Sequence, residues 1–517
     1  MSDPRSPAPT SDSRRIAPHR VTFAPQWSQP GTPFRHTWES VANIDQFRWL
    51  VRRDVQDHLA VARRELGIQH VRAVGMFDDE MRVYRPSPAS FMGTEPRTPR
   101  SNWQTVDYVM DSLLERGLSP MVTTSFVPSA MTSGPTTVFT TKGHTSPPDD
   151  WNQWSSLVED ATRHALDRYG PAVVRSWYFE VWNEPNLHGW FWGGDQAQFL
   201  KLWEVTYRAI KSVDASLRVG GPSCAKAGWI DELLAHGEEY DCRPDYLTAH
   251  IYNNDSVIGE ALAPFSDQAA APANQSPDYA MEVIRGVRAQ VKRHGFRGEL
   301  HWNEWGRSFH GVDHRRETAA EAAFIVRLLS EVSQEAEAFA YWCLSDIYDQ
   351  VGYGREAFHG GYGLMNLQGL RKPAYHAFQL LSRLGTERKI ISGIPPGGMV
   401  GAIATVDAKG RARILVYAYQ HDDAPVRQSL TVTVVLPPRS RPGAVYRIDH
   451  HDNNVLTQWR ELGAPDYLSR GQRAELAANN ELQPASPGAQ WTNDAGRNLA
   501  HFTMESPGVA LLEIEPA

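Results

Sequence analysis

The sequence predicts an α/β fold, a (β/α)8 TIM barrel, followed by a C-terminal antiparallel β-sandwich domain. Between residues 32 and 385, short apolar runs alternate with longer stretches of helical periodicity, and eight such repeats can be distinguished. After residue 385 the pattern changes to short strands separated by turn-forming residues, without a long helix. A chain of 517 residues is also too long for one hydrophobic core. Two domains are therefore expected.

The eight expected barrel strands are short runs of branched and aromatic residues. They are "TPFRHTWE" (32–39), "HVRAVGM" (70–76), "SPMVTTSF" (119–126), "SWYFEVWNE" (176–184), "LRVGGPS" (217–223), "YLTAHIY" (246–252), "ELHWNEWG" (299–306) and "AFAYWCLSD" (338–346). Segments such as "TAAEAAFIVRLLSEVSQ" (318–334) place apolar residues at three- and four-residue steps and are expected to be helices.

The predicted domain boundaries follow from these patterns. Residues 1–20 are rich in Pro, Ser and Arg and are expected to form a disordered tail. The catalytic barrel is expected over 21–385 and the accessory sandwich over 386–517, where "RILVYAYQ", "SLTVTVVLP" and "GVALLEIEP" are typical strands.

Composition excludes several classes of partner. The chain has 52 basic and 60 acidic residues, a net charge of −8, and no basic block that would neutralise phosphates, so no nucleic-acid partner is expected. No apolar run approaches the ~18 residues of a membrane span, and the first residues lack a signal-like apolar stretch. The three cysteines form no metal or redox motif. A cytoplasmic protein, as a monomer or a homo-oligomer, is the expectation.

Two glutamates stand at the ends of expected strands, where the active site of a TIM barrel forms. Glu184 follows "WYFEVWN" and Glu304 lies within "HWNEWG". A pair of carboxyl groups on either side of a glycosidic bond is what its hydrolysis requires. The alternative is that each glutamate caps a helix or pairs with an arginine. The chain has no GxSxG, Walker or HExxH motif, which argues against other hydrolase classes, and "HGGYG" (359–363) is interpreted as a loop.

The ordered set of these motifs resembles glycoside hydrolase family 39, the family of β-xylosidases and α-L-iduronidases. The set comprises "WYFEVWNEPNL", "AIKSVDASLRVGGPS", "HIY", "HWNEWG", "YWCLSDIYDQVG" and "FHGGYGLMNLQGLRKPAYHAF". The resemblance covers about residues 70–385 and extends weakly into the sandwich. It implies a retaining glycosidase that requires neither metal nor cofactor.

The resemblance also implies roles for individual residues. Glu184 corresponds to the acid/base and Glu304 to the nucleophile. Asn183 corresponds to the asparagine that binds the sugar 2-hydroxyl, and the substrate-binding set further includes His250, Tyr252, Trp342 and Asp349. The expected substrate is a short oligosaccharide or glycoside, from which a terminal pentosyl residue, β-xylosyl first of all, is removed.

Four positions depart from the family pattern. Val74 stands where the family carries a histidine, Thr123 where a glutamate is frequent, and Asp349 and Gln350 replace paired glutamates. These departures indicate a rebuilt pocket for the outer hydroxyls, so weak activity on β-xylosides is expected. They keep an α-L-arabinosidase or another β-glycosidase open as alternatives, and a catalytically silent carbohydrate-binding protein is a third.

Overall fold

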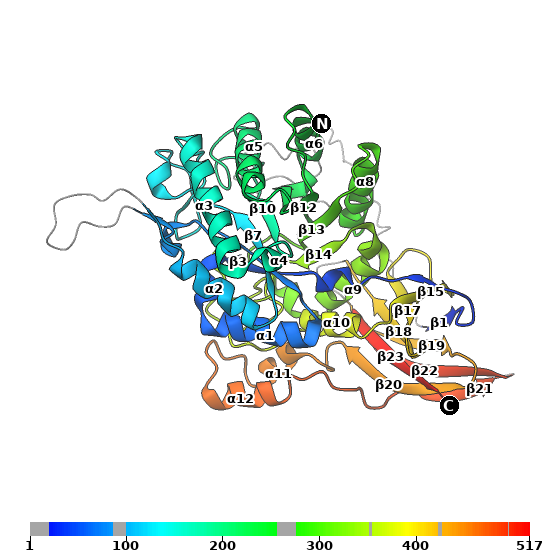
Figure 1. Cartoon of the computed structure of the whole chain (residues 1–517). Helices are drawn as coiled ribbons and strands as arrows, with labels where there is room; N and C mark the ends of the chain where they lie inside the picture. Colours follow the sequence, from blue (N-terminus) through cyan, green and yellow to red (C-terminus); the bar gives the residue numbers. More distant parts are fainter. Residues whose placement is uncertain are drawn as a thin grey trace, which may run out of the picture.

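The computed structural model describes residues 20–85, 100–255, 276–350, 354–421, 426–494 and 496–516. It consists of a barrel and a β-sandwich packed side by side (Figure 1). The predicted tail over residues 1–20 lies outside the described residues, except for Arg20. Within the described parts of the chain, no helix has the length and apolar character needed to cross a membrane.

Eight parallel strands form the barrel, and successive barrel strands pair with one another in the order of the sequence. In order around the sheet they are β3 (Val41–Gln46), β4 (His70–Val74), β7 (Ser119–Thr124), β10 (Tyr178–Val181), β11 (Arg218–Cys224), β12 (Tyr246–Tyr252), β13 (Glu299–Gly306) and β14 (Ala338–Tyr341). The first and last strands meet where Leu344 N donates to Asn43 O across 3.0 Å and Asn43 Nδ2 donates to Ala340 O across 3.2 Å. The TIM barrel prediction is confirmed.

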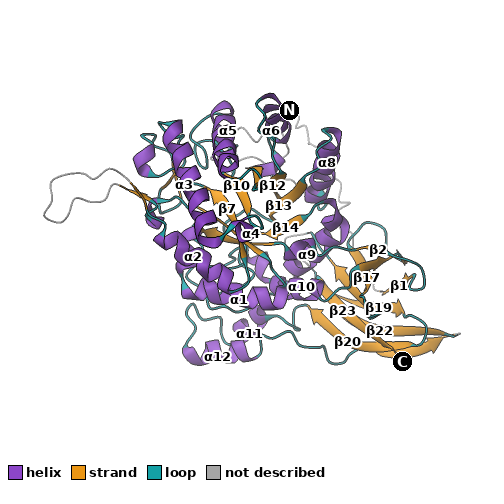
Figure 2. Cartoon of the chain, in the orientation of Figure 1, coloured by secondary structure: helices purple, strands orange, loops and turns teal. Residues whose placement is uncertain are grey.

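Helices surround this sheet on the outside (Figure 2). The longer ones are α1 (Arg53–Leu66), α2 (Gln104–Glu115), α3 (Trp151–Tyr169), α5 (Gln196–Val213), α6 (Ile230–Glu239), α8 (Tyr279–Arg293), α9 (Ala319–Val332) and α10 (Pro373–Ser382). Their starts carry the expected signals: Asp195 caps α5 in a capping box with Gln198, and Thr318 caps α9.

The expected first barrel strand at 32–39 is wrong. Only Thr32–Pro33 (β2) is extended, and it pairs with a sandwich strand, while Thr37–Glu39 forms a 3-10 helix. The true first barrel strand is β3, whose residues are all buried. Its sequence, "VANIDQ", contains three polar residues, so it lacks the apolar signature of a buried strand.

The sandwich contains two sheets of mainly antiparallel strands, and each sheet takes one strand from the first part of the described chain. One sheet has the order β16 (Ile391–Ser392), β1 (Arg20–Pro25), β19 (Gln428–Val435), β22 (Arg497–Ser506), β21 (Gln490–Asp494). The other has the order β2, β15 (Glu387–Lys389), β17 (Val400–Val406), β18 (Ala412–Ala418), β23 (Gly508–Pro516), β20 (Ser440–Ile448). Because β1 and β2 belong here, the assignment of residues 21–33 to the barrel is corrected. Two short helices, α11 (Val455–Glu461) and α12 (Arg470–Ala478), follow β20.

Helix α9 lies at the junction of the two domains. Almost every residue from Ala319 to Val332 is buried, including the charged Glu321 and Arg327, as expected of a helix covered on all sides. Arg327 donates from Nε to Gly398 O across 2.7 Å, which ties the helix to the sandwich. The two domains therefore share one continuous packed interior.

The barrel interior is layered. At the N-terminal end of the strands, Met121, Tyr178, Tyr246 and Ala338 belong to an apolar cluster. Toward the C-terminal ends the interior becomes polar, and the buried Arg72 and Glu180 pair there across 2.7 Å. The base of a site at the C-terminal ends of the barrel strands is therefore polar.

Candidate active site

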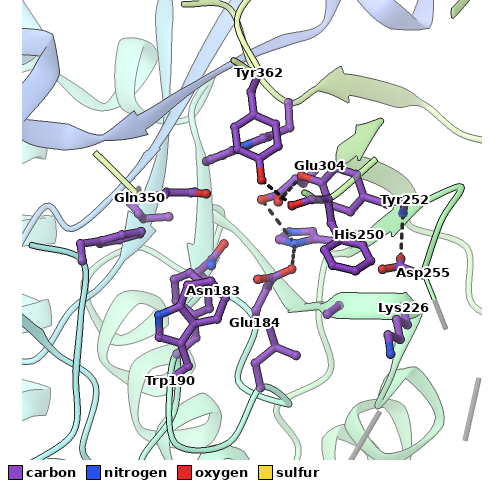
Figure 3. A pocket seen from close by; sticks show the side chains of 17 residues that line it. Asn183, Glu184, Trp190, Lys226, His250, Tyr252, Asp255, Glu304, Gln350 and Tyr362 are labelled. Carbon is purple, nitrogen blue, oxygen red and sulfur yellow. Dashed lines mark hydrogen bonds and ion pairs between the residues drawn. The ribbon is translucent and has the colours of Figure 1, made fainter. Parts of the chain in front are cut away.

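A cavity of about 850 Å³, part of it open to solvent, lies at the C-terminal ends of the barrel strands (Figure 3). Six of the seven residues expected to form the site line it: Asn183, Glu184, His250, Tyr252, Glu304 and Trp342. They come from the ends of four strands, β10, β12, β13 and β14, that are far apart in sequence. The barrel topology brings them together.

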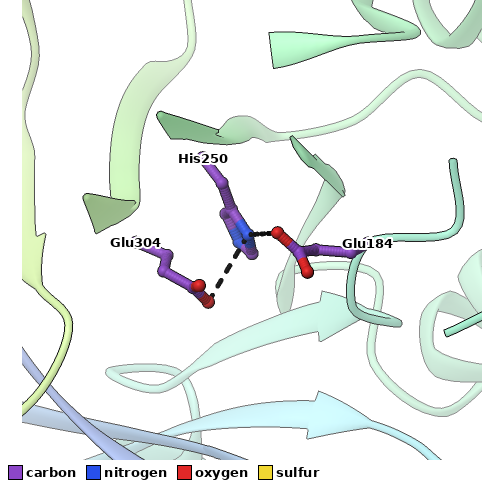
Figure 4. Close-up of side chains that lie close together, drawn as sticks. All are labelled: Glu184, His250 and Glu304. Atoms are coloured by element: carbon purple, nitrogen blue, oxygen red, sulfur yellow. Dashed lines mark hydrogen bonds and ion pairs between the residues drawn. The ribbon is translucent and has the colours of Figure 1, made fainter. Parts of the chain in front are cut away.

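The two glutamates face each other with His250 between them (Figure 4). His250 Nδ1 lies 3.0 Å from Glu184 Oε1 and 3.4 Å from Glu304 Oε2. One oxygen of each carboxyl group and the imidazole nitrogen all lie within 4.8 Å of one another. Among the described residues this is also the single group of such side chains close enough to hold a metal ion. The two-carboxylate chemistry itself needs no such ion.

The surroundings of the two carboxyl groups differ. Glu304 Oε1 accepts a hydrogen bond from the hydroxyl of Tyr252 across 2.7 Å, and Glu304 Oε2 lies 3.6 Å from Arg72 Nη1. Glu184 Oε1 is near His250. Hydrogen bonds and positive charge stabilise an ionised carboxylate, so this environment favours the charged form of Glu304 over that of Glu184.

Burial raises the pKa of both carboxyl groups. The pKa of Glu184 rises to about 7 because burial disfavours its charged form, against the opposing charges of Arg72 and Lys226. The pKa of Glu304 also rises to about 7, from burial and from the negative charge of Glu184, against His250 and Arg72. Two coupled carboxyl groups of this kind share one proton near neutral pH. Because of the hydrogen bond from Tyr252, we assign that proton to Glu184.

The backbone around Glu184 explains the Asn-Glu-Pro motif. Trp182 and Glu184 have φ values of 70° and 46°, a left-handed conformation that non-glycine residues rarely adopt. Two hydrogen bonds hold it: Glu184 N donates to Ser223 O across 2.9 Å, and Trp182 Nε1 donates to Phe191 O across 2.7 Å. The turn that aims Glu184 into the cavity is thereby fixed.

A buried network below the cavity orients Asn183. Arg72 donates from Nη2 to Asn183 Oδ1 across 2.7 Å and from Nε to Glu180 Oε2 across 2.7 Å. The amide oxygen of Asn183 is therefore engaged, and its NH2 group is the part left to face a ligand. Thr123 donates to Glu180 Oε2 across 2.9 Å. Thr123 thus belongs to this network and does not line the cavity, so its departure from the family pattern lies below the cavity.

Asp349 is the one expected site residue that does not line the cavity. Its carboxylate is held by Arg48 at 2.6 Å and by Thr140, and its backbone N donates to Asp45 Oδ2 across 3.0 Å. The neighbouring Gln350 lines the cavity instead. At this point of the site the structure thus places Gln350, and not Asp349, in the cavity lining. A one-residue shift in a loop reverses which side chain points inward, and a sequence pattern cannot resolve it.

Several lining residues were not identified from the sequence. Five aromatic side chains, Phe139, Trp190, Phe191, Phe309 and Tyr362, form much of the wall, and Lys226 and Asp255 add charge. Most of them come from the loops between strands, where no periodicity marks a residue as functional. The high Trp content and the "HGGYG" loop, which carries Tyr362, were the available signals. Val74, which stands where the family pattern carries a histidine, also lines the cavity.

The comparisons with known proteins agree with this geometry. Residues 23–497 match the model of Glycosyl hydrolases family 39. This chain belongs to glycosyl hydrolase family 39. A β-xylosidase of Caldicellulosiruptor saccharolyticus is 33% identical over 436 residues, which cover 84% of this chain and 86% of the relative. Human α-L-iduronidase is 24% identical over 393 residues, covering 65% and 56% of the two chains.

Solved structures show the same architecture. A monomeric β-xylosidase from Caulobacter crescentus CB15 superposes with a TM-score of 0.82 at 29% identity, covering 96% of this chain and 100% of that chain. The family 39 enzyme from Xanthomonas axonopodis pv. citri superposes with a TM-score of 0.81 at 28% identity, covering 99% and 100%. The family 39 chain described here is therefore a glycoside hydrolase with the barrel-and-sandwich fold of its relatives.

Proposed function

We propose that this family 39 enzyme is a retaining exo-glycosidase that removes terminal pentosyl residues, β-xylosyl first of all, from short oligosaccharides or glycosides. Glu304 acts as the nucleophile and Glu184 as the acid/base. The alternatives with the same machinery are an α-L-arabinosidase or another β-glycosidase.

The observation that carries the retaining mechanism is the separation of the two carboxyl groups. Their nearest oxygens lie within 4.8 Å of each other. Carboxyl groups about 5 to 5.5 Å apart suit a nucleophile that touches the anomeric carbon, whereas an inverting enzyme needs roughly 6.5 to 9.5 Å to admit water. The spacing therefore supports double displacement.

The difference between the two glutamates supports the division of roles. A nucleophile must be ionised, and Glu304 accepts a hydrogen bond from Tyr252 and lies close to Arg72. An acid must carry a proton at the working pH, and burial keeps the pKa of Glu184 near 7. In the first step, Glu304 bonds to the anomeric carbon while Glu184 protonates the leaving oxygen. In the second step, Glu184 takes a proton from water, which displaces Glu304.

The shape of the cavity supports a small, ring-shaped substrate. Aromatic side chains form its walls, and their faces suit the C–H faces of a sugar ring. Asn183 and Gln350 place amide groups in the same cavity. The relatives named as β-xylosidases support β-xylosyl as the first choice of sugar.

A panel of nitrophenyl glycosides tests the proposal, with the anomeric configuration of the first product followed by NMR. We expect β-xyloside to be hydrolysed with net retention. An inverted first product would overturn the mechanism. A panel in which β-xyloside is inert while an α-L-arabinoside is cleaved would replace the sugar assignment and leave the mechanism intact.

A further inference from the structure

The end of β11 and the loop that follows it adopt an unusual backbone conformation beside the catalytic cavity. Ser223, Lys226, Ala227 and Trp229 have φ values of 54°, 55°, 52° and 59°, although none of them is glycine. Each such residue costs on the order of 1 kcal/mol or more and persists only where its surroundings enforce it. The contacts that hold this loop in its conformation therefore indicate which of its side chains has a fixed position at the cavity.

Those contacts come from the loop that carries Glu184. Asn186, which is 1% exposed, donates from Nδ2 to Ala225 O across 2.9 Å and accepts at Oδ1 from Ala225 N across 3.0 Å. Glu184 N donates to Ser223 O across 2.9 Å. The side chain of Asn186 thus pairs with the backbone just before Lys226. The acid/base loop and the Lys226 loop are joined as one rigid unit.

This unit places an ammonium group in the wall of the cavity. Lys226 is 5% exposed and lines the cavity together with Glu184 and Asp255. Figure 3 shows Lys226 and Asp255 on one side of Glu184 and Gln350 on the other. Burying an ammonium group is costly unless negative charge compensates it, and Glu184 and Asp255 are carboxyl groups within its electrostatic reach.

We propose that Lys226 is an electrostatic partner of Glu184 in catalysis, and that Asn186 is the positioning residue that holds it there. The inference rests on the proposed acid/base role of Glu184. The proposed role of Lys226 concerns the state of the enzyme after the first step. The proton has then moved from Glu184 to the leaving oxygen, the bond from Glu304 to the anomeric carbon has formed, and Glu184 is a buried anion. The ammonium of Lys226 stabilises this anion until it accepts a proton from the attacking water.

Electrostatics in the free enzyme agree with this arrangement. The charges of Arg72 and Lys226 both lower the pKa of Glu184 against the effect of burial. The titratable groups in the electrostatic surroundings of Glu184 are Arg72 on β4, Cys224 and Lys226 at and after β11, His250, Tyr252 and Asp255 at the end of β12, Glu304 on β13, and Tyr362 after β14. Arg72 also pairs with Glu180 and lies 3.6 Å from Glu304, so its charge is shared.

The test is the pH dependence of kcat/KM for a nitrophenyl glycoside in Lys226→Met, Lys226→Arg and Asn186→Ala, beside the wild type. Without the ammonium, Glu184 holds its proton to higher pH, so we expect Lys226→Met to move the basic limb upward by roughly 0.5 to 1 pH unit. Lys226→Arg, which keeps the charge, should show the basic limb at the same pH as the wild type. Asn186→Ala should move it in the same direction as Lys226→Met. Lys201→Met, on the outer surface of α5, is the matched control.

The outcomes separate the inference from the proposed function. If Glu184→Ala abolishes the basic limb but Lys226→Met leaves it unmoved, the electrostatic role of Lys226 is wrong and the acid/base assignment stands. If Glu184→Ala retains the wild-type limb, the acid/base assignment itself fails. Should Asn186→Ala not fold, Lys226→Met decides the electrostatic role. The positioning role of Asn186 then rests on Asn186→Ser, an uncharged replacement that is too short to pair with Ala225 and should move the limb in the same direction as Lys226→Met. A wild-type limb in that variant would refute it.

Discussion

The hydroxyl of Tyr252 donates a hydrogen bond to Glu304 across 2.7 Å, while Glu184, the other carboxyl group of the pair, is held by His250 at 3.0 Å. This contact, together with Arg72 Nη1 at 3.6 Å from Glu304, makes two otherwise similar buried carboxyl groups inequivalent. It stabilises the negative charge on Glu304 and leaves the shared proton to Glu184.

Removing that contact should impair Glu304 in its proposed role as the nucleophile. In Tyr252→Phe, the charged form of Glu304 loses a hydrogen bond of about 1.5 to 3 kcal/mol, so we expect kcat/KM to fall by roughly 10- to 100-fold. The acidic limb of the pH profile should move upward, because Glu304 then ionises at higher pH. Tyr362→Phe is the matched control, since Tyr362 lines the same cavity but donates to the backbone oxygen of Phe309. An unmoved acidic limb in Tyr252→Phe would contradict this account of Glu304.

If Glu304 is the nucleophile and Glu184 the acid/base, as proposed, the two should respond differently to replacement by alanine. Glu304→Ala should lose turnover on every substrate, because no glycosyl-enzyme can form. Glu184→Ala should still react with a dinitrophenyl glycoside, whose leaving group needs little protonation, and should then stall without its base, worth about 10²- to 10⁴-fold. Azide should restore turnover in Glu184→Ala and give a product of retained configuration. An inverted glycosyl azide from Glu184→Ala would mean that the two roles are exchanged.

The raised pKa of Glu184 also predicts how stability depends on pH. The folded protein holds this proton up to about pH 7, whereas the unfolded chain releases it near 4.5. Ionised Glu184 therefore destabilises the folded state, by an amount that is absent below pH 4.5, grows between pH 4.5 and 7, and is complete above pH 7. Glu184→Gln removes this cost. Its free energy of unfolding should exceed that of the wild type by about 1 to 3 kcal/mol at pH 8 and match it near pH 4.5.

Thermal unfolding followed by circular dichroism at both pH values measures this effect. Glu475→Gln, on the exposed face of α12, serves as the control and should show no such dependence. Equal melting temperatures of Glu184→Gln and the wild type at pH 8 would show that Glu184 is not destabilised by burial.

Val74 tests the origin of sugar specificity. Its apolar side chain lines the cavity and offers no hydrogen bond to a hydroxyl group. A missing partner for a buried hydroxyl costs on the order of 1 to 3 kcal/mol, so the wild type should use β-xyloside less well than a variant that supplies the partner. Val74→His should therefore raise kcat/KM on β-xyloside by about 10-fold, and Val74→Leu should not. An unchanged kcat/KM on β-xyloside in Val74→His would refute this interpretation.

The sandwich should be indispensable for solubility. Helix α9 is buried on all sides because β18 and β23 pack against its outer face. A chain ending at residue 385 would expose that face and leave β1 without its partner β19. We expect this truncation to be insoluble when expressed, in contrast to the full chain. A soluble and fully active truncated protein would contradict the packing role assigned to the sandwich.

Sequence patterns predicted the barrel, the sandwich and six of the lining residues because these depend on periodicity and on residues at strand ends. Seven barrel strands were located to within a few residues, since each is an apolar run. The first was missed because Asn43, Asp45 and Gln46 are buried through hydrogen bonds, which leave no apolar signature. Loop conformations decide that Gln350 and Lys226 line the cavity and that Asp349 does not. These are set by distant partners such as Arg48 and Asn186, and no local pattern encodes them.

The pairing of β1 with β19 has a consequence for how the protein is made. Residues 20–23 lie in parallel register with residues 431–434, so β1 waits for a partner that is synthesised about 400 residues later. At roughly 5 to 20 residues per second, this interval lasts on the order of 20 to 80 seconds on the ribosome. The barrel strands from β3 onward can pair during that time, whereas the sandwich can be completed only after its last strand, β23, has been synthesised. Slow-folding variants are therefore expected to fail first at this long-range closure, by offering the unpaired β1 edge to other chains.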